Sequence, residues 1–140
     1  MRRIWGVGIV LLLLLSPHCV FAQGTGKNGS RLKGNYPNPF NPTTTIPFSI
    51  LESDVANGKP AKVTIRILNV LQQLVAFPLA MDNPAGNGPV ENMLYTQPGE
   101  YKAYWDSTDR TGRRAASGIY YAVLVVNGER DAPRKLLVTK

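Results

Sequence analysis

The sequence predicts an all-β fold, a sandwich of about seven short antiparallel strands. From Thr44 onward, apolar and polar residues alternate in steps of two, which is typical of half-buried strands. Turn signals rich in glycine, proline and asparagine interrupt this alternation at roughly the 8–12-residue spacing of sandwich proteins. Beyond the first 22 residues, no apolar repeat has helical spacing. These three observations favour two stacked sheets over a helical or mixed fold.

Residues 1–22 are expected to form a signal-peptide helix that precedes the sandwich. Arg2 and Arg3 come before an apolar run at residues 4–15, and a small-residue site ends at Ala22, just before Gln23. This is the layout of a secretory signal peptide, which is removed during export. The apolar run is shorter than the about 20 residues that a membrane-spanning helix needs. The sequence therefore predicts cleavage between Ala22 and Gln23, and contact with a membrane only through this segment during export.

The composition of the remaining 118 residues excludes several classes of function. The chain's one cysteine, Cys19, and its one histidine, His18, both lie in the signal segment. The mature part then lacks thiolate nucleophiles, imidazole bases and the usual zinc ligands. A sandwich of this size without large insertions is not expected to form the deep cleft that a glycosidase carboxylate pair requires. We therefore expect neither an enzyme nor a bound cofactor.

The charge distribution argues against a nucleic-acid partner. Loss of Arg2 and Arg3 lowers the formal net charge from +7 to +5. The basic residues are scattered, apart from the doublets at 113–114 and 134–135, whereas nucleic-acid-binding domains gather them into a stripe. As for size, the 118 residues that follow the signal segment correspond to the length of one domain.

The chain after the signal begins with two non-repetitive segments. Residues 23–33 contain three glycines and no period, and they are predicted to be a flexible linker. The domain is expected to span residues 34–140. Its first residues, 35–42, read N-Y-P-N-P-F-N-P, and three prolines in six positions fix φ and remove backbone donors. This segment is predicted to be a stiff, extended entry, with Tyr36 and Phe40 as anchors on the domain.

Seven strands are predicted after this entry. Residues 62–68 show the clearest alternation, with Val63, Ile65 and Ile67 facing the core and Lys62, Thr64 and Arg66 facing outward. Residues 119–126 are β-branched and aromatic throughout, which favours a central strand covered on both faces. The predicted strands are 44–51, 62–68, 71–79, 93–95, 100–105, 119–126 and 134–139. The sandwich is of the immunoglobulin-like kind, but without a cysteine pair its core must hold by packing alone.

The densest polar cluster lies at residues 106–112, and it has two interpretations. Asp106 and Asp109 are carboxylates of the kind that bind calcium, but calcium takes six to eight oxygen ligands, and no glutamate completes the loop. Aspartates also hold tight turns through bonds to backbone N–H groups, and Gly112 supplies a positive φ. The ligand count favours the turn. Four aromatic residues have strand spacing, which favours a core role over a binding face: Tyr101, Trp105, Tyr120 and Tyr121.

Three sequence blocks resemble a known family. The opening N-Y-P-N-P-F-N-P-T-T-T-I at 35–46, the block W-D…D…G…S-G-I-Y at 105–120 and the basic final strand at 134–140 resemble type A C-terminal sorting domains of the type IX secretion system. Residues 63–75 resemble that family's central strand pair. The middle block is also similar to the immunoglobulin-like domain of flagellar hook-capping proteins. Ser107 and Gln72 occupy positions where the family has glycine.

This resemblance implies a non-catalytic export and sorting module. It implies that an outer-membrane secretion translocon and a sortase-like peptidase are the partners, with cleavage in or near residues 23–33. It also implies delivery through the periplasm to the cell surface or the medium, and recognition that includes the last strand, through shape and edge pairing. The alternative is a small structural or adhesive module of an envelope or surface assembly. The implied recognition residues are Asn35, Tyr36, Pro37, Asn38, Pro39, Phe40, Asn41, Pro42, Trp105, Asp106, Asp109, Gly112, Ser117, Gly118, Tyr120, Lys135, Val138 and Lys140.

Overall fold

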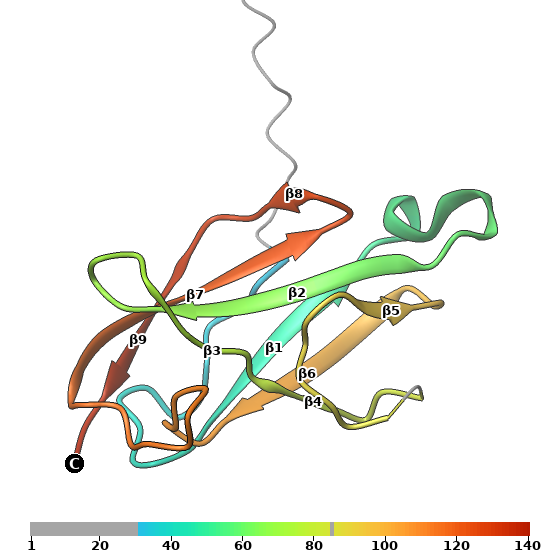
Figure 1. The fold of residues 1–140 in the computed structure, drawn as a ribbon. Helices are drawn as coiled ribbons and strands as arrows, with labels where there is room; N and C mark the ends of the chain where they lie inside the picture. Colours follow the sequence, from blue (N-terminus) through green and yellow to red (C-terminus); the bar gives the residue numbers. More distant parts are fainter. Residues whose placement is uncertain (1–30, 85) are drawn as a thin grey trace, which may run out of the picture.

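The computed structural model describes residues 31–84 and 86–140, which form two antiparallel sheets stacked face to face (Figure 1). This confirms the predicted all-β sandwich. The predicted signal peptide, its cleavage site at Ala22 and Gln23, and linker residues 23–30 lie outside the described residues. Within the described part of the chain, no helix is both long enough and apolar enough to cross a bilayer.

The smaller sheet has the strand order β1-β6-β4. Its strands are β1 (Thr44–Ile50), β6 (Gly99–Trp105) and β4 (Leu79–Met81). Thr44 lies opposite Trp105 and Ile50 lies opposite Gly99, so β1 and β6 pair along their whole length. Because side chains alternate along a strand, Ile46 and Phe48 face the second sheet and are fully buried.

The larger sheet is built around two long strands, β2 (Ala61–Leu68) and β7 (Gly118–Val126), which pair from Val63↔Val126 to Leu68↔Tyr121. Two short strands pair with the other edge of β2, and two pair with the other edge of β7. These are β3 (Leu74–Ala76) and β5 (Met93–Tyr95) beside β2, and β8 (Glu129–Arg130) and β9 (Arg134–Val138) beside β7.

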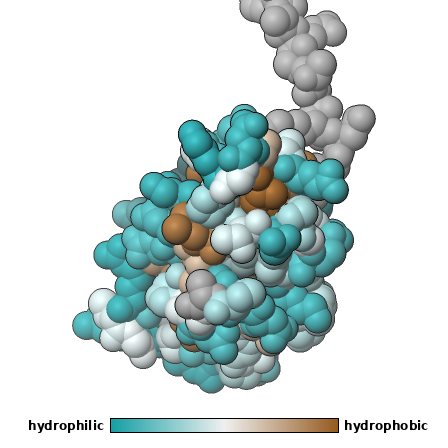
Figure 2. Space-filling view, turned by 90° about the vertical axis from the view of Figure 1, so that its right-hand side faces the viewer, coloured by the Kyte–Doolittle hydropathy of each residue, from teal (hydrophilic) through white to brown (hydrophobic). Residues whose placement is uncertain are grey.

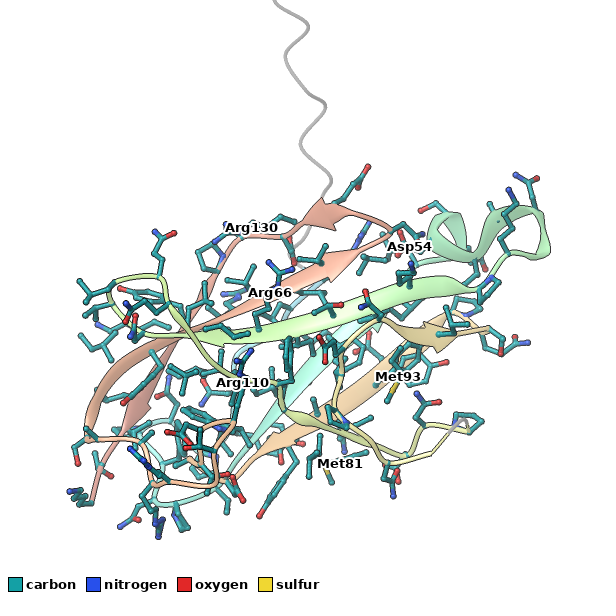
Figure 3. The ribbon with its side chains drawn as sticks, in the orientation of Figure 1. Asp54, Arg66, Met81, Met93, Arg110 and Arg130 are labelled. Atoms are coloured by element: carbon teal, nitrogen blue, oxygen red, sulfur yellow. The ribbon has the colours of Figure 1, made fainter. Side chains whose placement is uncertain are left out.

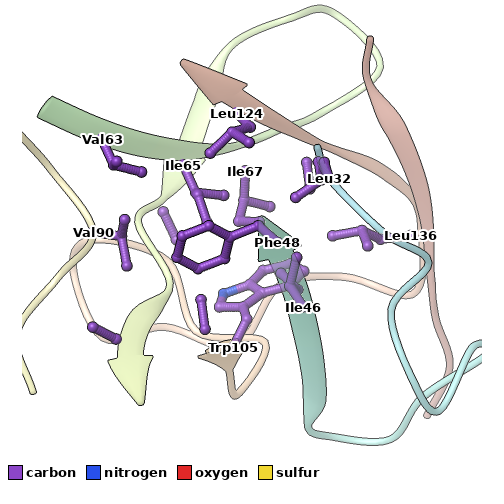
Figure 4. Packing of buried hydrophobic residues seen from close by; sticks show 14 of the residues in the cluster. Leu32, Ile46, Phe48, Val63, Ile65, Ile67, Val90, Trp105, Leu124 and Leu136 are labelled. Atoms are coloured by element: carbon purple, nitrogen blue, oxygen red, sulfur yellow. The ribbon is translucent and has the colours of Figure 1, made fainter. Parts of the chain in front are cut away.

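The core lies between the sheets, as Figure 4 shows. Val63, Ile65 and Ile67 of β2 point inward and are fully buried, as predicted. Thr64, predicted to face outward, is 8% exposed, because the hydroxyl oxygen of Thr64 accepts a 2.9 Å hydrogen bond from the N–H of Asn92 in a loop that covers it. In β7 the outer face is covered only in part, since Val123 is buried but Ile119 is exposed.

The segment predicted as one strand at 71–79 contains two strands that belong to different sheets. β3 ends at Ala76 and pairs with β2, whereas β4 begins at Leu79 and pairs with β6. Pro78 lies between them. Because proline has no N–H to donate, the row of backbone hydrogen bonds between paired strands is interrupted at this point. The chain therefore crosses from one sheet to the other where the sequence pattern shows a continuous apolar run.

The first described residues are not linker but part of the folded unit, which corrects the boundary predicted at residue 34. Leu32 is fully buried, Lys33 N–H donates to Pro47 O at 2.9 Å, and Ser49 N–H donates to Arg31 O at 2.8 Å. Residues 31–33 thus run along the free edge of β1 and extend the smaller sheet.

The proline-rich segment is bent rather than extended. The peptide bonds before Pro37, Pro39 and Pro42 are all cis. Tyr36 pairs with Thr45 of β1, and four residues later Phe40 pairs with Val138 of β9 in the other sheet. Phe40 is 1% exposed and is the predicted anchor, whereas Tyr36 is 49% exposed and is not one. One segment therefore covers an edge of both sheets.

Candidate recognition site

The three sequence blocks of the sorting-domain resemblance meet at one end of the sandwich, which we call the terminal corner (residues 38–42, 105–117 and 135–140). In Figure 1 it lies at the end marked C, away from β5. The rings of Phe40 and Trp105 meet edge-to-face with centroids 5.7 Å apart, and those of Trp105 and Tyr120 do so at 5.5 Å. Phe40 comes from the first block and the other two rings from the two ends of the middle block, so packing in the core joins segments that are far apart in sequence.

The polar ends of two of these rings hold the loop between β6 and β7. The Nε1–H of Trp105 donates to the carbonyl of Thr108 at 2.9 Å, and the hydroxyl of Tyr120 donates to the carbonyl of Ala116 at 2.8 Å. Buried Trp and Tyr side chains need such partners for their polar atoms. Both residues are therefore structural, as their strand spacing predicts.

The outer edge of β9 is already bonded, which contradicts the expectation of recognition by edge pairing. Phe40 N–H donates to Leu137 O at 3.0 Å, and Thr139 N–H donates to Phe40 O at 3.0 Å. The Asn38 side chain accepts from Leu137 N–H at 3.1 Å and donates to Lys135 O at 3.4 Å. A partner strand would have to displace residues 38–40 first. The last strand instead offers the side chains of its exposed residues.

A second set of bonds fixes the start of the proline-rich segment. Asn35, which is 8% exposed, donates from Nδ2 to Thr44 Oγ1 at 2.9 Å and to Pro37 O at 3.2 Å. The Thr44 hydroxyl in turn donates to Pro37 O at 2.9 Å. These contacts place Asn35 and Thr44 in a structural role.

Asp106 and Asp109 act as turn residues. Asp106 Oδ1 accepts from the N–H of Thr108 at 3.0 Å, and Asp109 Oδ1 accepts from the N–H groups of Thr111 and Arg113 at 2.8 and 3.0 Å. The hydrogen bond from the Thr111 side chain, followed by the backbone bond from Arg113, lowers the pKa of Asp109 below its ordinary value. In residues 31–84 and 86–140, no three Asp, Glu, His or Cys side chains gather as a metal site.

The backbone conformation explains why the family has glycine at the two positions that Ser107 and Gln72 occupy here. Ser107 and Gln72 have φ values of 64° and 61°, in the left-handed region that favours glycine. Ser107 is 2% exposed, and its hydroxyl donates to the carbonyl of Pro42, which joins the loop to the proline-rich segment. Gly112 (φ 84°) also has the positive φ that its residue type predicts.

The predicted recognition residues divide into a buried and an exposed group. The buried members are Asn35, Phe40, Trp105, Tyr120 and Val138. The exposed members are Tyr36, Pro37, Asn38, Pro39, Asn41, Gly112, Ser117, Lys135 and Lys140, while Pro42, Asp106, Asp109 and Gly118 are intermediate. Only the exposed group offers side chains to a partner, and the buried group holds it in place.

A surface hollow of about 340 Å³ lies where the three blocks meet. It is lined by Asn41 and Pro42 of the first block, by Ser107, Arg114 and Ala115 of the loop, and by Val138, Thr139 and Lys140 of the last block. Ser107, Arg114, Ala115 and Thr139 were absent from the sequence-predicted set. The charge doublet at 113–114 was the one signal that pointed to Arg114.

Comparisons with known proteins support the fold. No protein-family model and no curated protein matches the chain. A structure of dimeric latent PorU from Porphyromonas gingivalis is similar over 77% of this chain, with a TM-score of 0.51 and 21% identity, and the match spans 9% of that protein. A Pseudomonas fluorescens alkylpurine DNA glycosylase, AlkC, bound to DNA with an abasic site analog, matches 80% of this chain and 31% of its own. Its TM-score of 0.42 and 14% identity carry no argument. The PorU match shows a shared fold for most of this chain.

Proposed function

We propose that this chain is a non-catalytic sorting module that directs export to the outer membrane or cell surface through type IX secretion. The observation that carries the proposal is the convergence of the three resembling blocks at the terminal corner, through the ring contact of Phe40 with Trp105 and the backbone hydrogen bonds of Phe40 with Leu137 and Thr139. Blocks that served only separate local turns would have no reason to line one surface hollow. The similarity in fold to a segment of PorU is consistent with a link to type IX secretion.

In this proposal the signal peptide at residues 1–22 takes the chain to the periplasm, where the domain is recognised after folding. The outer-membrane translocon recognises the exposed side chains of the terminal corner, among them Asn41, Lys135 and Lys140. A sortase-like peptidase would cut before Arg31, because residues 31–33 are held along β1 and do not present an extended, free backbone. Covalent chemistry then belongs to the partner and not to this chain.

The test is a secretion assay with a reporter fused between the signal peptide and residues 23–140, in a host with type IX secretion. We expect the reporter at the cell surface or in the medium, and in the periplasm of the same host without its translocon. Retention of the intact reporter in the periplasm of the competent host would contradict the proposal.

Deletion of the last strand is a poor second test, because Leu136 and Val138 belong to the core and their loss would disturb folding. The double substitution Lys135→Glu, Lys140→Glu changes two exposed side chains instead. We expect it to reduce surface delivery. The matched control is Lys59→Glu, Lys62→Glu, which makes the same charge change at exposed positions outside the terminal corner.

The alternative, a subunit of an envelope or surface assembly, is favoured by one feature. Val70 and Leu71 are 64% and 74% exposed at the turn between β2 and β3, where the Asn69 side chain accepts from the N–H groups of Leu71 and Gln73. A turn held in this way presents two apolar side chains to a partner. A stable complex with an envelope protein that is lost in Leu71→Ser would favour this alternative.

A further inference from the structure

A second hollow lies next to the one at the terminal corner. This neighbouring hollow has a volume of about 420 Å³ and lies between the β3 edge and the loop after β6. Both hollows are lined by Arg114 and Ala115, so these two residues lie between them. We call the two hollows together, from Lys140 to Arg110, the Arg114 groove.

The Arg114 groove is positively charged. Arg114, Arg110 and Lys140 line it, and in the described part of the chain no ion pair joins any of the three to a carboxylate. Asp109 is the one side-chain carboxylate among the described lining residues, and its Oδ1 already accepts hydrogen bonds from the loop. A charged groove of this kind favours a ligand of opposite sign.

The lining between these charges is mainly apolar in the first hollow and mixed in the second. Val138 and Ala115 line the first hollow, and Leu74 and Tyr120 are apolar residues of the second, beside polar ones. Two neighbouring hollows, each with apolar residues and a cationic side chain, suit side chains that project from an extended chain, rather than one compact ion. The covered edge of β9 means that such a chain would bind through side chains and not by adding a strand.

We infer that the Arg114 groove binds an extended acidic peptide segment of a partner protein, in which carboxylate residues alternate with aliphatic ones. This inference rests on the proposed function, since the partner is then the machinery that reads the terminal corner. Arg114 holds the central position because it can reach a carboxylate in either hollow, and guanidinium groups bind carboxylates with two parallel hydrogen bonds.

The test uses the chain from Gln23 to Lys140, since both sheets and the described core lie within it. The probe is a fluorescein-labelled heptapeptide in which glutamate alternates with leucine, and the control peptide has glutamine in place of glutamate. Binding is measured by fluorescence anisotropy at about 0.1 M salt, where the Debye length is about 10 Å. We expect Arg114→Gln to weaken binding about tenfold, as for one lost charge-assisted hydrogen-bonded pair, and the control peptide to bind as weakly.

Arg66→Gln is the matched control variant. Arg66 is an exposed arginine of β2 that lines neither hollow, and Figure 3 shows Arg66 on the larger sheet and Arg110 below it. We expect a change in affinity below about twofold, since charges beyond about 10 Å are screened at moderate salt. Equal losses in the two variants would mean diffuse attraction and would overturn the site.

Two further outcomes are decisive. Equal affinity for the glutamine peptide would overturn the acidic ligand, and tighter, Arg114-dependent binding of anionic phosphatidylglycerol vesicles would assign the groove to a membrane instead.

The secretion assay separates this inference from the proposed function. If the reporter is exported normally in Arg114→Gln, the groove is not the reading site and the sorting function stands; if the wild-type reporter is not exported, the sorting function itself fails.

Discussion

The two ends of the sandwich share aromatic packing but differ in their polar contacts. At the terminal corner, three aromatic rings and backbone hydrogen bonds join segments distant in sequence. At the opposite end, the rings of Phe48, Tyr95 and Tyr101 pack together, and ion pairs hold the first described residues. Arg31 Nη2 lies 2.9 Å from Asp54 Oδ1, and Lys33 Nζ lies 2.6 Å from Glu100 Oε2.

We call this second region the entry end (residues 31–33, η1 at Glu52–Gly58, and β5). Figure 2 faces it and shows a largely hydrophilic surface with small, separate hydrophobic areas. Because apolar packing does not depend on salt whereas exposed ion pairs do, the two ends should respond differently to the same perturbation. The end that carries the proposed recognition surface is the one at which no ion pair joins the described residues.

The largest effect is expected at the terminal corner. Trp105→Ala removes a ring that is 2% exposed and contacts both Phe40 and Tyr120, so it should lower the free energy of unfolding by about 3–5 kcal/mol. Tyr36→Ala, on the same segment but half exposed, should change it by no more than about 0.5 kcal/mol. Urea denaturation measures both. Similar values for the two variants would mean that the aromatic cluster does not hold the corner.

The next effect is expected at the entry end. Arg31 and Asp54 side chains are both 7% exposed, so Arg31→Ala leaves a buried carboxylate without its ion pair and should cost about 3 kcal/mol. The Lys33–Glu100 pair is exposed, and Lys33→Ala should cost less than about 1 kcal/mol. Thermal unfolding distinguishes these values. A larger loss for Lys33→Ala would show that burial does not decide the strength of these pairs.

A smaller effect of opposite sign is expected at Gln72 and Ser107, which both have a positive φ. Gln72→Gly relieves an unfavourable backbone conformation and should stabilise the domain by about 0.5–1 kcal/mol. Ser107→Gly gains the same relief but loses the hydrogen bond to Pro42, worth about 1 kcal/mol, so it should be nearly neutral. Chemical denaturation of both variants checks this. Stabilisation by Ser107→Gly as large as that by Gln72→Gly would show that the Ser107 hydroxyl contributes nothing.

The smallest effect is the pH dependence of stability that comes from the lowered pKa of Glu100. The hydrogen bond from Lys33, followed by that from Ser49, lowers the pKa of Glu100 below its ordinary value. A carboxyl group with a lowered pKa in the folded state stabilises the fold above its unfolded pKa, and this contribution is lost as pH falls through the folded pKa. NMR titration should show the lowered pKa of Glu100 and its rise in Lys33→Met. An unchanged pKa in that variant would remove Lys33 as the cause.

Much of the fold follows from local pattern. The alternation at Val63, Ile65 and Ile67 predicts which face of β2 is buried, because side chains on a strand point to opposite sides in turn. The aspartates and Gly112 predict the loop after β6, because these residues bond or bend their own neighbouring backbone. The resemblance also named residues that lie at the terminal corner, such as Phe40, Trp105 and Val138, but it omitted Arg114 and did not separate residues that face solvent from those that hold the corner.

The tertiary structure alone decided three features, each of which depends on partners remote in sequence. Asn38 bonds Leu137 across 99 positions and closes the edge of β9, the loop at Asn92 buries Thr64, and Arg114 comes to lie between two hollows. A sequence pattern records only the preference of each residue for strand, turn, core or solvent. Which exposed side chains share a surface, and which strand edge remains open, depends on how the sheets stack and where the connecting segments cross between them.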